Sequence, residues 1–236
     1  MTARGINNIC ALKFASEDLQ RDRDIVMAAK KNDGEVLKFT SVNLQRDRDK
    51  VMTAVNNVGW TLKFALEDLH REGEIVMAGV KTNGEALQFA SEDLRRDRYI
   101  VMAAVNIYGL ALEFELDDLK RDRDIVMTAV KNHGLALRHV YNGLRGYKAI
   151  VLEAVKEHGQ ALELASFELR CDCDLVLEAA EHNSLSLHHA NMTRISRDNT
   201  KIPAKFCKLL SCLNSMTSLY TLFREKPDFV QYRLLQ

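Results

Sequence analysis

Residues 84–109 read Gly84-Glu-Ala-Leu-Gln-Phe-Ala-Ser-Glu-Asp-Leu-Arg-Arg-Asp-Arg-Tyr-Ile-Val-Met-Ala-Ala-Val-Asn-Ile-Tyr-Gly109. A glycine stands at each end of this stretch, and glycine recurs at the same interval along much of the chain. A leucine column and a valine column share the period. The three columns are Gly34, Gly59, Gly84, Gly109, Gly134 and Gly159; Leu12, Leu37, Leu62, Leu87, Leu112, Leu137, Leu162 and Leu187; and Val26, Val51, Val76, Val101, Val126, Val151 and Val176. A fixed period of this length is typical of a tandem array of small structural units.

Each unit of the array predicts two helices. In the unit from Glu85 to Gly109, the apolar residues within 86–90 have helical spacing and predict a short first helix. Leu94 is expected to fill the turn that follows, because every unit has leucine in that slot. The second helix then carries the apolar residues 100–105, a stripe wider than a surface helix needs. A stripe of this width predicts neighbours on two sides.

The second helix has recognisable start and stop signals. An acid precedes it in most units, and its carboxylate is expected to accept hydrogen bonds from the first backbone N–H groups of the helix. The residues in this N-cap slot are Asp22, Asp47, Glu72, Asp97, Asp122 and Asp172, with Tyr147 as the exception. The periodic glycine is expected to end the helix in a left-handed conformation, which glycine adopts at little cost.

Helices this short are marginal in water when isolated, so stacking of the units must supply the stability. The sequence therefore predicts an all-α fold, an α-solenoid of about seven 25-residue two-helix repeats with a C-terminal capping helix. The leucine, phenylalanine, valine and methionine columns are expected to be buried between units. On this basis Leu94→Ala should cost about 2–5 kcal/mol.

The repeat pattern also sets the expected boundaries. Residues 1–9 form a partial N-terminal repeat, residues 10–184 hold seven tandem repeats, and residues 185–203 form a degenerate eighth repeat with Arg194 in the leucine slot. Residues 204–236 contain an amphipathic pattern that predicts a capping helix and a tail. The alternative is that this segment binds a partner or a membrane surface instead.

Composition excludes several classes of protein. Lys plus Arg equals Asp plus Glu at 33 each, so no net charge attracts nucleic acid, and we expect no nucleic-acid partner. No apolar run is long enough for a membrane span, and no secretion signal is evident, which favours a cytoplasmic location. The five cysteines fall outside the repeated columns and are expected to be thiols.

No motif predicts catalysis, a cofactor or a metal. A serine–histidine–acid arrangement, a glycine-rich phosphate loop and paired metal-ligand spacings are all missing from the sequence. His133 and His158 share a slot, but equivalent positions in stacked units should lie roughly 9–10 Å apart, too far to share a zinc ion. The Arg-Asp-Arg-Asp runs are expected to form a solvated face on which each unit neutralises itself.

Residues that vary between the units are candidates for recognition, because packing does not fix them. Variation concentrates beside the periodic glycine, where Trp60, Tyr108, His133 and His158 are expected to line a binding edge. Neutral drift in a loop remains the alternative explanation.

The unit, as seen in residues 84–97 followed by 100–105 and Gly109, resembles a short tandem-repeat family classed as a domain of unknown function. The resemblance covers roughly residues 10–190, with Tyr141, Gly143, Gly146 and Tyr147 departing most from the pattern. It implies a helical scaffold with no established activity or site.

The expected function is a non-catalytic scaffold that binds an unidentified protein or peptide partner, rather than an enzyme. The alternative is an accessory repeat array of a larger protein whose catalytic domain is absent from this chain. The oligomeric state is not predicted.

Overall fold

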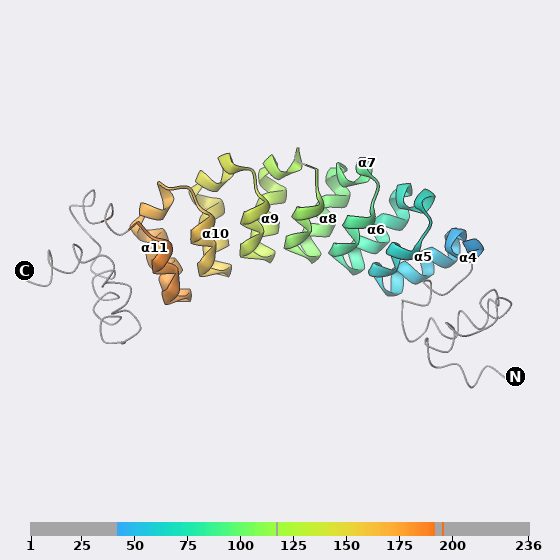
Figure 1. The fold of residues 1–236 in the computed structure, drawn as a ribbon, viewed down its shortest axis with the longest axis horizontal. Helices are drawn as coiled ribbons and strands as arrows, with labels where there is room; N and C mark the ends of the chain where they lie inside the picture. Colours follow the sequence, from blue (N-terminus) through green and yellow to red (C-terminus); the bar gives the residue numbers. More distant parts are fainter. Residues whose placement is uncertain (1–41, 117, 192–194, 196–236) are drawn as a thin grey trace, which may run out of the picture. The chain divides into compact units, whose positions relative to one another are not determined.

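The computed structural model describes residues 42–116, 118–191 and 195. They belong to two compact units: unit 1 ends at Asn132 and unit 2 begins at His133. Within the described residues every regular element is a helix (Figure 1). The expected all-α class is therefore confirmed for this part of the chain. Residues 1–9 and 204–236, for which we expect a partial repeat and a capping helix, lie outside the described residues.

The helices are of two kinds, α-helices and tighter 3₁₀-helices. In unit 1 they are α4 (Val42–Arg46), α5 (Arg48–Asn57), η3 (Gly59–Phe64), η4 (Glu67–Arg71), α6 (Gly73–Thr82), η5 (Gly84–Phe89), α7 (Glu92–Arg95), α8 (Arg98–Ile107), η6 (Gly109–Phe114), η7 (Leu119–Arg121) and α9 (Arg123–Asn132). In unit 2 they are η8 (Gly134–His139), η9 (Asn142–Gly146), α10 (Lys148–Glu157), η10 (Gly159–Leu164), η11 (Leu169–Cys171), α11 (Cys173–His182) and η12 (Ser184–His189).

Each complete repeat contains three helical segments, not the two that the sequence predicts. A six-residue 3₁₀-helix begins at the periodic glycine, as η5 does at Gly84. A second short helix, which we call the plug segment, carries the leucine that was expected to fill the turn, as α7 carries Leu94. A ten-residue α-helix such as α8 follows. The plug segment is helical rather than a simple turn because Ser91 accepts the first backbone hydrogen bond, from Arg95, at 2.9 Å.

The expected role of the periodic glycine is wrong. No glycine in the described residues has a positive φ, and helix α8 already ends at Ile107, with Tyr108 extended. A Cβ atom on Gly84 would instead overlap the carbonyl oxygen of Ala104, in helix α8 of the same repeat. Gly59, Gly134 and Gly159 face the equivalent carbonyl of their own repeats, and for Gly159 the separation from Ala179 O would be 2.6 Å. Glycine is needed here because two backbones approach closely.

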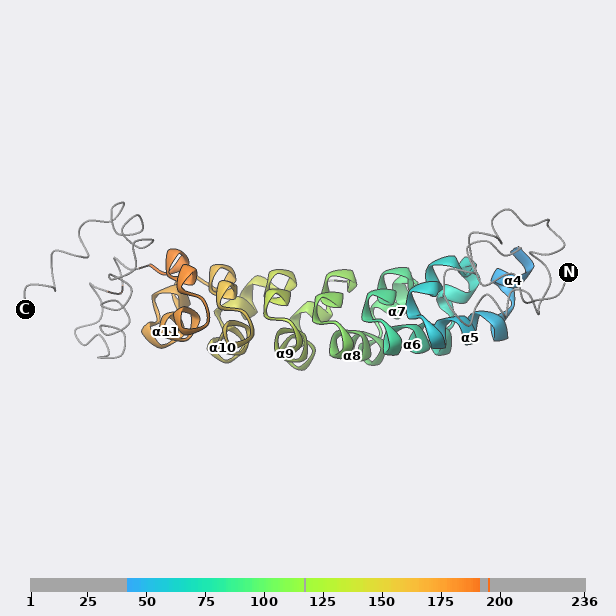
Figure 2. The same cartoon turned by 90° about the horizontal axis from the view of Figure 1, so that it is seen from below.

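Equivalent segments of consecutive repeats lie side by side within each unit. In unit 1, α6 contacts α5 and α8, and α8 contacts α9; in unit 2, α10 contacts α11 (Figures 1 and 2). The 3₁₀-helices follow the same rule, since η5 contacts η3 and η6, and η10 contacts η8 and η12. Each repeat therefore packs on its sequence neighbours.

The leucine and valine columns form the core between the repeats. Leu87 and Val101 are fully buried, as are their described equivalents, with relative exposures of 0–2%. Phe89, Met102 and Leu94 are only half-buried, so the expected burial of the phenylalanine and methionine columns is wrong. Ile100, Ala104 and Val105 of the same repeat are buried instead.

Four of the expected N-caps are confirmed. Asp97 Oδ1 accepts hydrogen bonds from the backbone N–H groups of Tyr99 and Ile100, at 2.8 and 3.2 Å. The equivalent bonds are made by Asp47, Asp122 and Asp172. Glu72 makes no cap bond, so that expectation is wrong, and Asp22 lies outside the described residues.

Glu72 is occupied by an ion pair with the preceding repeat. Arg48 Nε lies 2.8 Å from Glu72 Oε2, and the guanidinium also pairs with Glu74. Arg98 repeats this arrangement with Asp122 and Asp124, at 2.8 and 2.9 Å. Some of the charges are thus neutralised between repeats, which the sequence did not predict, whereas Lys50 pairs with Asp47 within one repeat. Lys148 also pairs forward, with Asp172 at 2.6 Å.

Repeat features persist at the C-terminal end of the described residues. Helix η12 starts at Ser184, which replaces the periodic glycine, and Asn191 N donates to Arg170 O at 3.0 Å. Arg194, the expected occupant of the leucine slot, lies outside the described residues, whereas Ile195 is fully buried. Cys171 and Cys173 are present as thiols.

Candidate functional site

The slot before each described periodic glycine, or before Ser184, holds asparagine, an aromatic residue or, in one described repeat, Val58, which makes no cap bond. Asn83 Oδ1 accepts a hydrogen bond from Glu85 N at 2.9 Å, and Asn183 Oδ1 accepts one from Leu185 N at 3.0 Å. These asparagines cap the 3₁₀-helices η5 and η12. Tyr108, His133 and His158 occupy the same slot without a side-chain cap bond. The aromatic residues in this slot therefore do not serve the helix that follows them.

The slot one residue earlier has a structural role that the sequence did not reveal. Asn132 Nδ2 donates to Asn106 O at 3.1 Å, and its Oδ1 accepts a hydrogen bond from Gly109 N at 2.7 Å. Thr82 Oγ1 likewise donates to Val55 O at 3.1 Å. These side chains tie one repeat to the preceding one. For Asn132 and Thr82 the side chain therefore has a structural role.

Trp60 lies half-buried in η3 and contacts the next repeat. Its ring meets the Phe89 ring edge to face, with centroids 5.0 Å apart and an interplanar angle of 82°. Lys63 Nζ lies 5.7 Å from the centroid of the indole, within the range of a cation–π contact. One side of the indole is thus used for packing in unit 1.

Tyr108 is half-buried at the start of η6. Burial raises the pKa of its hydroxyl above the ordinary value, and the nearby Glu85 carboxylate raises this pKa further. The phenol is therefore neutral at neutral pH and interacts with the Glu85 carboxylate.

His133 and His158 are brought together in unit 2. Their rings are stacked, with centroids 6.0 Å apart and an interplanar angle of 20°. This separation is shorter than the roughly 9–10 Å expected between equivalent positions of stacked units. Within the described residues, no group of three or more histidine, cysteine, aspartate or glutamate side chains is arranged to hold a metal ion.

The four residues of the expected edge thus fall into two sets. Trp60 and Tyr108 belong to unit 1 and have different neighbours, Phe89 for the indole and Glu85 for the phenol. His133 and His158 belong to unit 2 and contact each other. Sequence position did not reveal these pairings.

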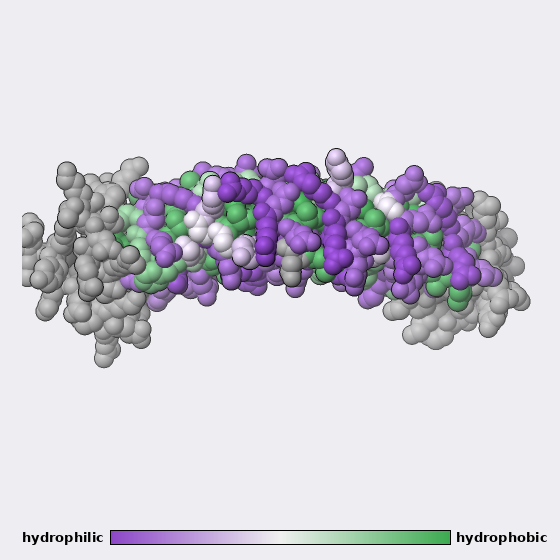
Figure 3. Space-filling view, turned by 90° about the horizontal axis from the view of Figure 1, so that it is seen from above, coloured by the Kyte–Doolittle hydropathy of each residue, from purple (hydrophilic) through white to green (hydrophobic). Residues whose placement is uncertain are grey.

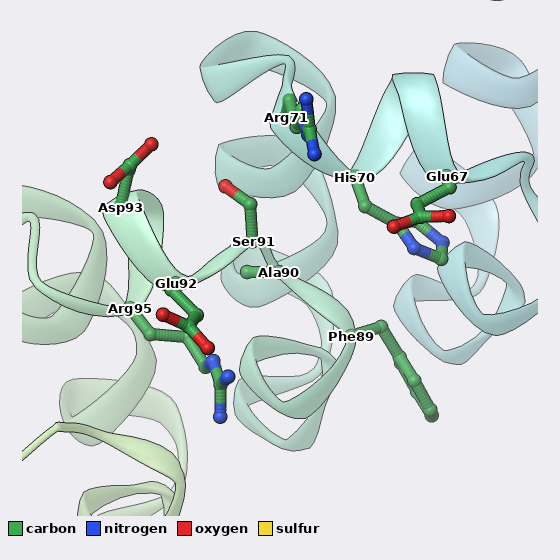
Figure 4. Close-up of a pocket in the computed structure, with 9 residues that line it drawn as sticks. All are labelled: Glu67, His70, Arg71, Phe89, Ala90, Ser91, Glu92, Asp93 and Arg95. Carbon is green, nitrogen blue, oxygen red and sulfur yellow. The ribbon is translucent and has the colours of Figure 1, made fainter.

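A pocket that the sequence did not reveal lies between two plug segments of unit 1. It has a volume of about 490 Å³ and is lined by Glu67, His70, Arg71, Phe89, Ala90, Ser91, Glu92, Asp93 and Arg95. Figure 4 shows His70 and Glu67 on one side and Glu92 and Arg95 beside each other on the opposite side. Most of the lining is polar, so the pocket suits a polar ligand.

The plug segments of the two units differ in surface chemistry. In unit 1 they present exposed charged residues, including Asp68, Arg71 and Arg96. In unit 2 they present Tyr141, Tyr147 and Phe167, which are 44–48% exposed. The face in Figure 3 is mostly hydrophilic, with hydrophobic side chains visible between hydrophilic rows. Phe167 was missed because it replaces an acid in a single repeat.

The repeat pattern and the helical contacts define a tandem helical repeat protein. A family model described as Domain of unknown function (DUF4116) matches residues 6–45, 22–70, 47–95, 73–114, 97–145 and 147–193. These matches cover more than half of the chain, which therefore belongs to this family. No curated protein matches the chain, and no solved structure does. The described residues contain no helix with the length and hydrophobicity of a membrane span.

Proposed function

We propose that this chain is a non-catalytic repeat scaffold that binds a protein or peptide partner, and that its repeats form an α-solenoid. The packing of equivalent helices on each other within each unit supports the solenoid. In such an arrangement the contacts between neighbouring repeats supply the stability. Side chains that these contacts do not use remain for recognition.

The observation that carries the proposal is the division of the slot before the glycine. Where the slot holds asparagine, the side chain caps a helix; where it holds Tyr108, His133 or His158, it does not. Tryptophan and tyrosine are among the residues that most often dominate the energetics of an interface. This favours a binding role for the aromatic residues of this slot, together with Trp60.

The use of the repeated acids supports a non-catalytic role. Asp97, Asp122 and Asp172 accept hydrogen bonds from the first turn of the following helix. Asp122 also pairs with the preceding repeat. Carboxylates committed in this way are structural and are not poised for proton transfer.

The proposal is tested by affinity capture from cell extract with quantification of each recovered protein. Trp60→Ala/Tyr108→Ala removes the unit 1 residues, and His133→Ala/His158→Ala removes the unit 2 residues. Tyr99→Ala is the matched control, because Tyr99 is 78% exposed and lies in α8 away from the slot. We expect loss of specific partners with either double variant and none with the control. Equal recovery with all variants would rule out this edge.

A further inference from the structure

The first plug segment of unit 2, η9, lacks the acids that plug segments carry in unit 1. Three slots in and directly after the plug segment are acidic in two repeats of unit 1, at Glu67, Asp68 and Glu72 and at Glu92, Asp93 and Asp97. In unit 2 the same three slots hold Asn142, Gly143 and Tyr147. The surface around η9 has therefore lost three carboxylates.

Two arginines at this segment have no carboxylate partner among the described residues. Arg145 Nε donates to Val140 O at 3.1 Å, and its Nη2 donates to Arg138 O at 2.7 Å. Its third nitrogen, Nη1, is neither hydrogen-bonded nor buried within the part of the chain that the structure describes, so it can still donate to a ligand. The side chain of Arg138 is exposed. By contrast, Lys148 of the same repeat pairs with Asp172 at 2.6 Å.

Two tyrosines flank the same segment. Tyr141 directly precedes η9 and Tyr147 directly follows it, and both side chains are exposed. A Cβ atom on Gly143 would lie 3.0 Å from Tyr141 Cε1, so the tyrosine ring rests against the backbone at this glycine. Glycine in place of the usual acid thus leaves room for the ring.

Phe167 adds a third exposed aromatic side chain from the next plug segment. The two segments are joined directly, since Ser166 N donates to Arg145 O at 3.0 Å. Phe167 follows Ser166 in the chain, and Tyr147 lies two residues after Arg145. This hydrogen bond therefore brings aromatic residues of consecutive repeats to the arginines. We call Arg138, Tyr141, Arg145, Tyr147 and Phe167 the plug surface of unit 2.

The charges of unit 2 favour an acidic ligand at the plug surface. A ligand carboxylate would be attracted to Arg138 and Arg145, and Nη1 of Arg145 could donate a charge-assisted hydrogen bond to it. Glu163 and Glu168 belong to the following repeat and would repel a second acid there. The ligand acid is therefore expected beside the arginines, with an uncharged apolar group toward Phe167.

The same distribution of charge disfavours a nucleic acid strand. A strand carries a phosphate on every nucleotide, so a strand that runs along consecutive plug segments would also meet Glu168. A short peptide can instead combine one acidic position with an apolar one. Aromatic residues and arginine are also the side chains that most often dominate protein interfaces.

We propose that the plug surface of unit 2 binds a short acidic segment of a protein partner. An aspartate or glutamate of the segment pairs with Arg138 and Arg145, and a neighbouring apolar side chain packs on Tyr141, Tyr147 and Phe167. This inference rests on the proposed scaffold function. It adds a contact surface on the plug segments, separate from the residues beside the glycine.

The test is selection of binders from a random dodecapeptide display library on the full chain. Enriched peptides are synthesised, and their Kd values are measured by fluorescence anisotropy. The test variant is Asn142→Glu/Phe167→Glu, because Glu67 and Glu92 occupy the same slot in unit 1 and show that the repeat accommodates glutamate there. Arg138→Gln removes one positive charge. Glu92→Gln is the matched control in the same slot of unit 1.

We expect the enriched peptides to contain aspartate or glutamate next to an apolar residue. Asn142→Glu/Phe167→Glu should weaken their binding about tenfold or more, and Arg138→Gln about threefold or more. Glu92→Gln should change the Kd less than about twofold. Binding to the unaltered chain should also weaken as salt is added. Unchanged thermal midpoints would show that all three variants fold.

Other outcomes would overturn the inference. Enrichment of basic peptides, or equal Kd values for Asn142→Glu/Phe167→Glu and Glu92→Gln, would contradict it. Competition by a twelve-nucleotide thymidine oligomer at the same concentration would assign the surface to nucleic acid. Self-association in sedimentation experiments that Asn142→Glu/Phe167→Glu abolishes would assign it to a second copy of the chain.

Failure of this surface can be told apart from failure of the scaffold function. Peptides that lose binding in His133→Ala/His158→Ala but not in Asn142→Glu/Phe167→Glu would leave the scaffold function standing and rule out the plug surface. Acidic peptides that depend on the plug surface alone would support it even if the residues beside the glycine bind nothing. A library that yields no binder would count against both.

Discussion

Gly84 lies so close to the carbonyl oxygen of Ala104 that no Cβ atom fits between them. Both residues belong to one repeat, Gly84 to η5 and Ala104 to α8. The glycine column therefore records a close backbone approach that recurs within each repeat, at Gly59, Gly134 and Gly159. The glycine is where the 3₁₀-helix of a repeat meets the long α-helix of the same repeat.

Substitution of Gly84 tests this role. Gly84→Ala and Gly84→Asn should both destabilise unit 1 by about 1–3 kcal/mol, because each introduces a Cβ into a filled space. If a left-handed conformation were required instead, asparagine would be much better tolerated than alanine. Gly73→Ala is the control, since its Cβ would meet only Leu94 Cδ2, at 3.9 Å, and stability should be unchanged or raised. Urea unfolding of the three variants measures the difference.

Two leucines of one repeat should differ in their contribution to stability. Leu87 is fully buried, so Leu87→Ala should cost about 2–5 kcal/mol. Leu94 is half-buried, so Leu94→Ala should fall at or below the lower end of that range, less than the sequence alone suggests. Chemical unfolding of the two variants gives the comparison. Equal losses would mean that the plug contributes as much as the core.

Asp122 links the stability of unit 1 to pH. Burial raises the pKa of its carboxyl, but hydrogen bonds from Arg98 and from the backbone of Ile125 and Asp124 lower it more, and the net pKa is below the ordinary value. A depressed pKa contributes stability above the unfolded pKa, about 3.9, that is lost as pH falls through the folded value.

The corresponding variant is Asp122→Ala, which should cost about 1 kcal/mol at pH 7. This difference from the unaltered chain should shrink below about pH 3.9, because protonation then removes the same interactions from both. Asp118→Ala is the control, since Asp118 is exposed and makes no side-chain cap bond. Urea titrations at several pH values measure the trend, and a difference that stays constant with pH would contradict it.

The single tryptophan reports directly on one contact between repeats. Trp60 packs edge to face on Phe89, so Phe89→Leu should change the fluorescence emission of the folded protein and cost about 0.5–1.5 kcal/mol beyond the lost burial. Phe114→Leu is the matched control from the same column, one repeat further on. An emission spectrum that responds equally to both changes would argue against the contact.

Much of the repeat was predictable from sequence because its signals are local. Periodic Leu87 and Val101 predicted a buried column, and Asp97 predicted a cap, since both depend only on spacing within a helix. The role of Gly84 was not predictable, because a recurring glycine is equally consistent with a left-handed turn or with close backbone approach. The 3₁₀ character of η5 was likewise hidden, since six residues are too few to distinguish the two helical periods.

For the candidate site, the sequence could indicate only the positions beside the glycine and not the contacts that their side chains make. Variation beside the glycine indicated Tyr108 and His133, but not that Asn83 in the same slot caps a helix. The 6.0 Å stacking of His133 on His158 depends on side-chain directions that spacing does not fix. The pocket around Arg95 is lined by residues of two repeats, which no linear pattern reveals.

The dependence of each repeat on its neighbours is tested most directly by the unfolding of fragments that contain one, two, three or four consecutive repeats of unit 1. Circular dichroism during urea titration measures the helix content and stability of each fragment. Stability should rise with every added repeat, and a single repeat such as residues 84–108 should be unfolded in water. A single repeat that is stably helical, or a stability that does not change with the number of repeats, would contradict this dependence.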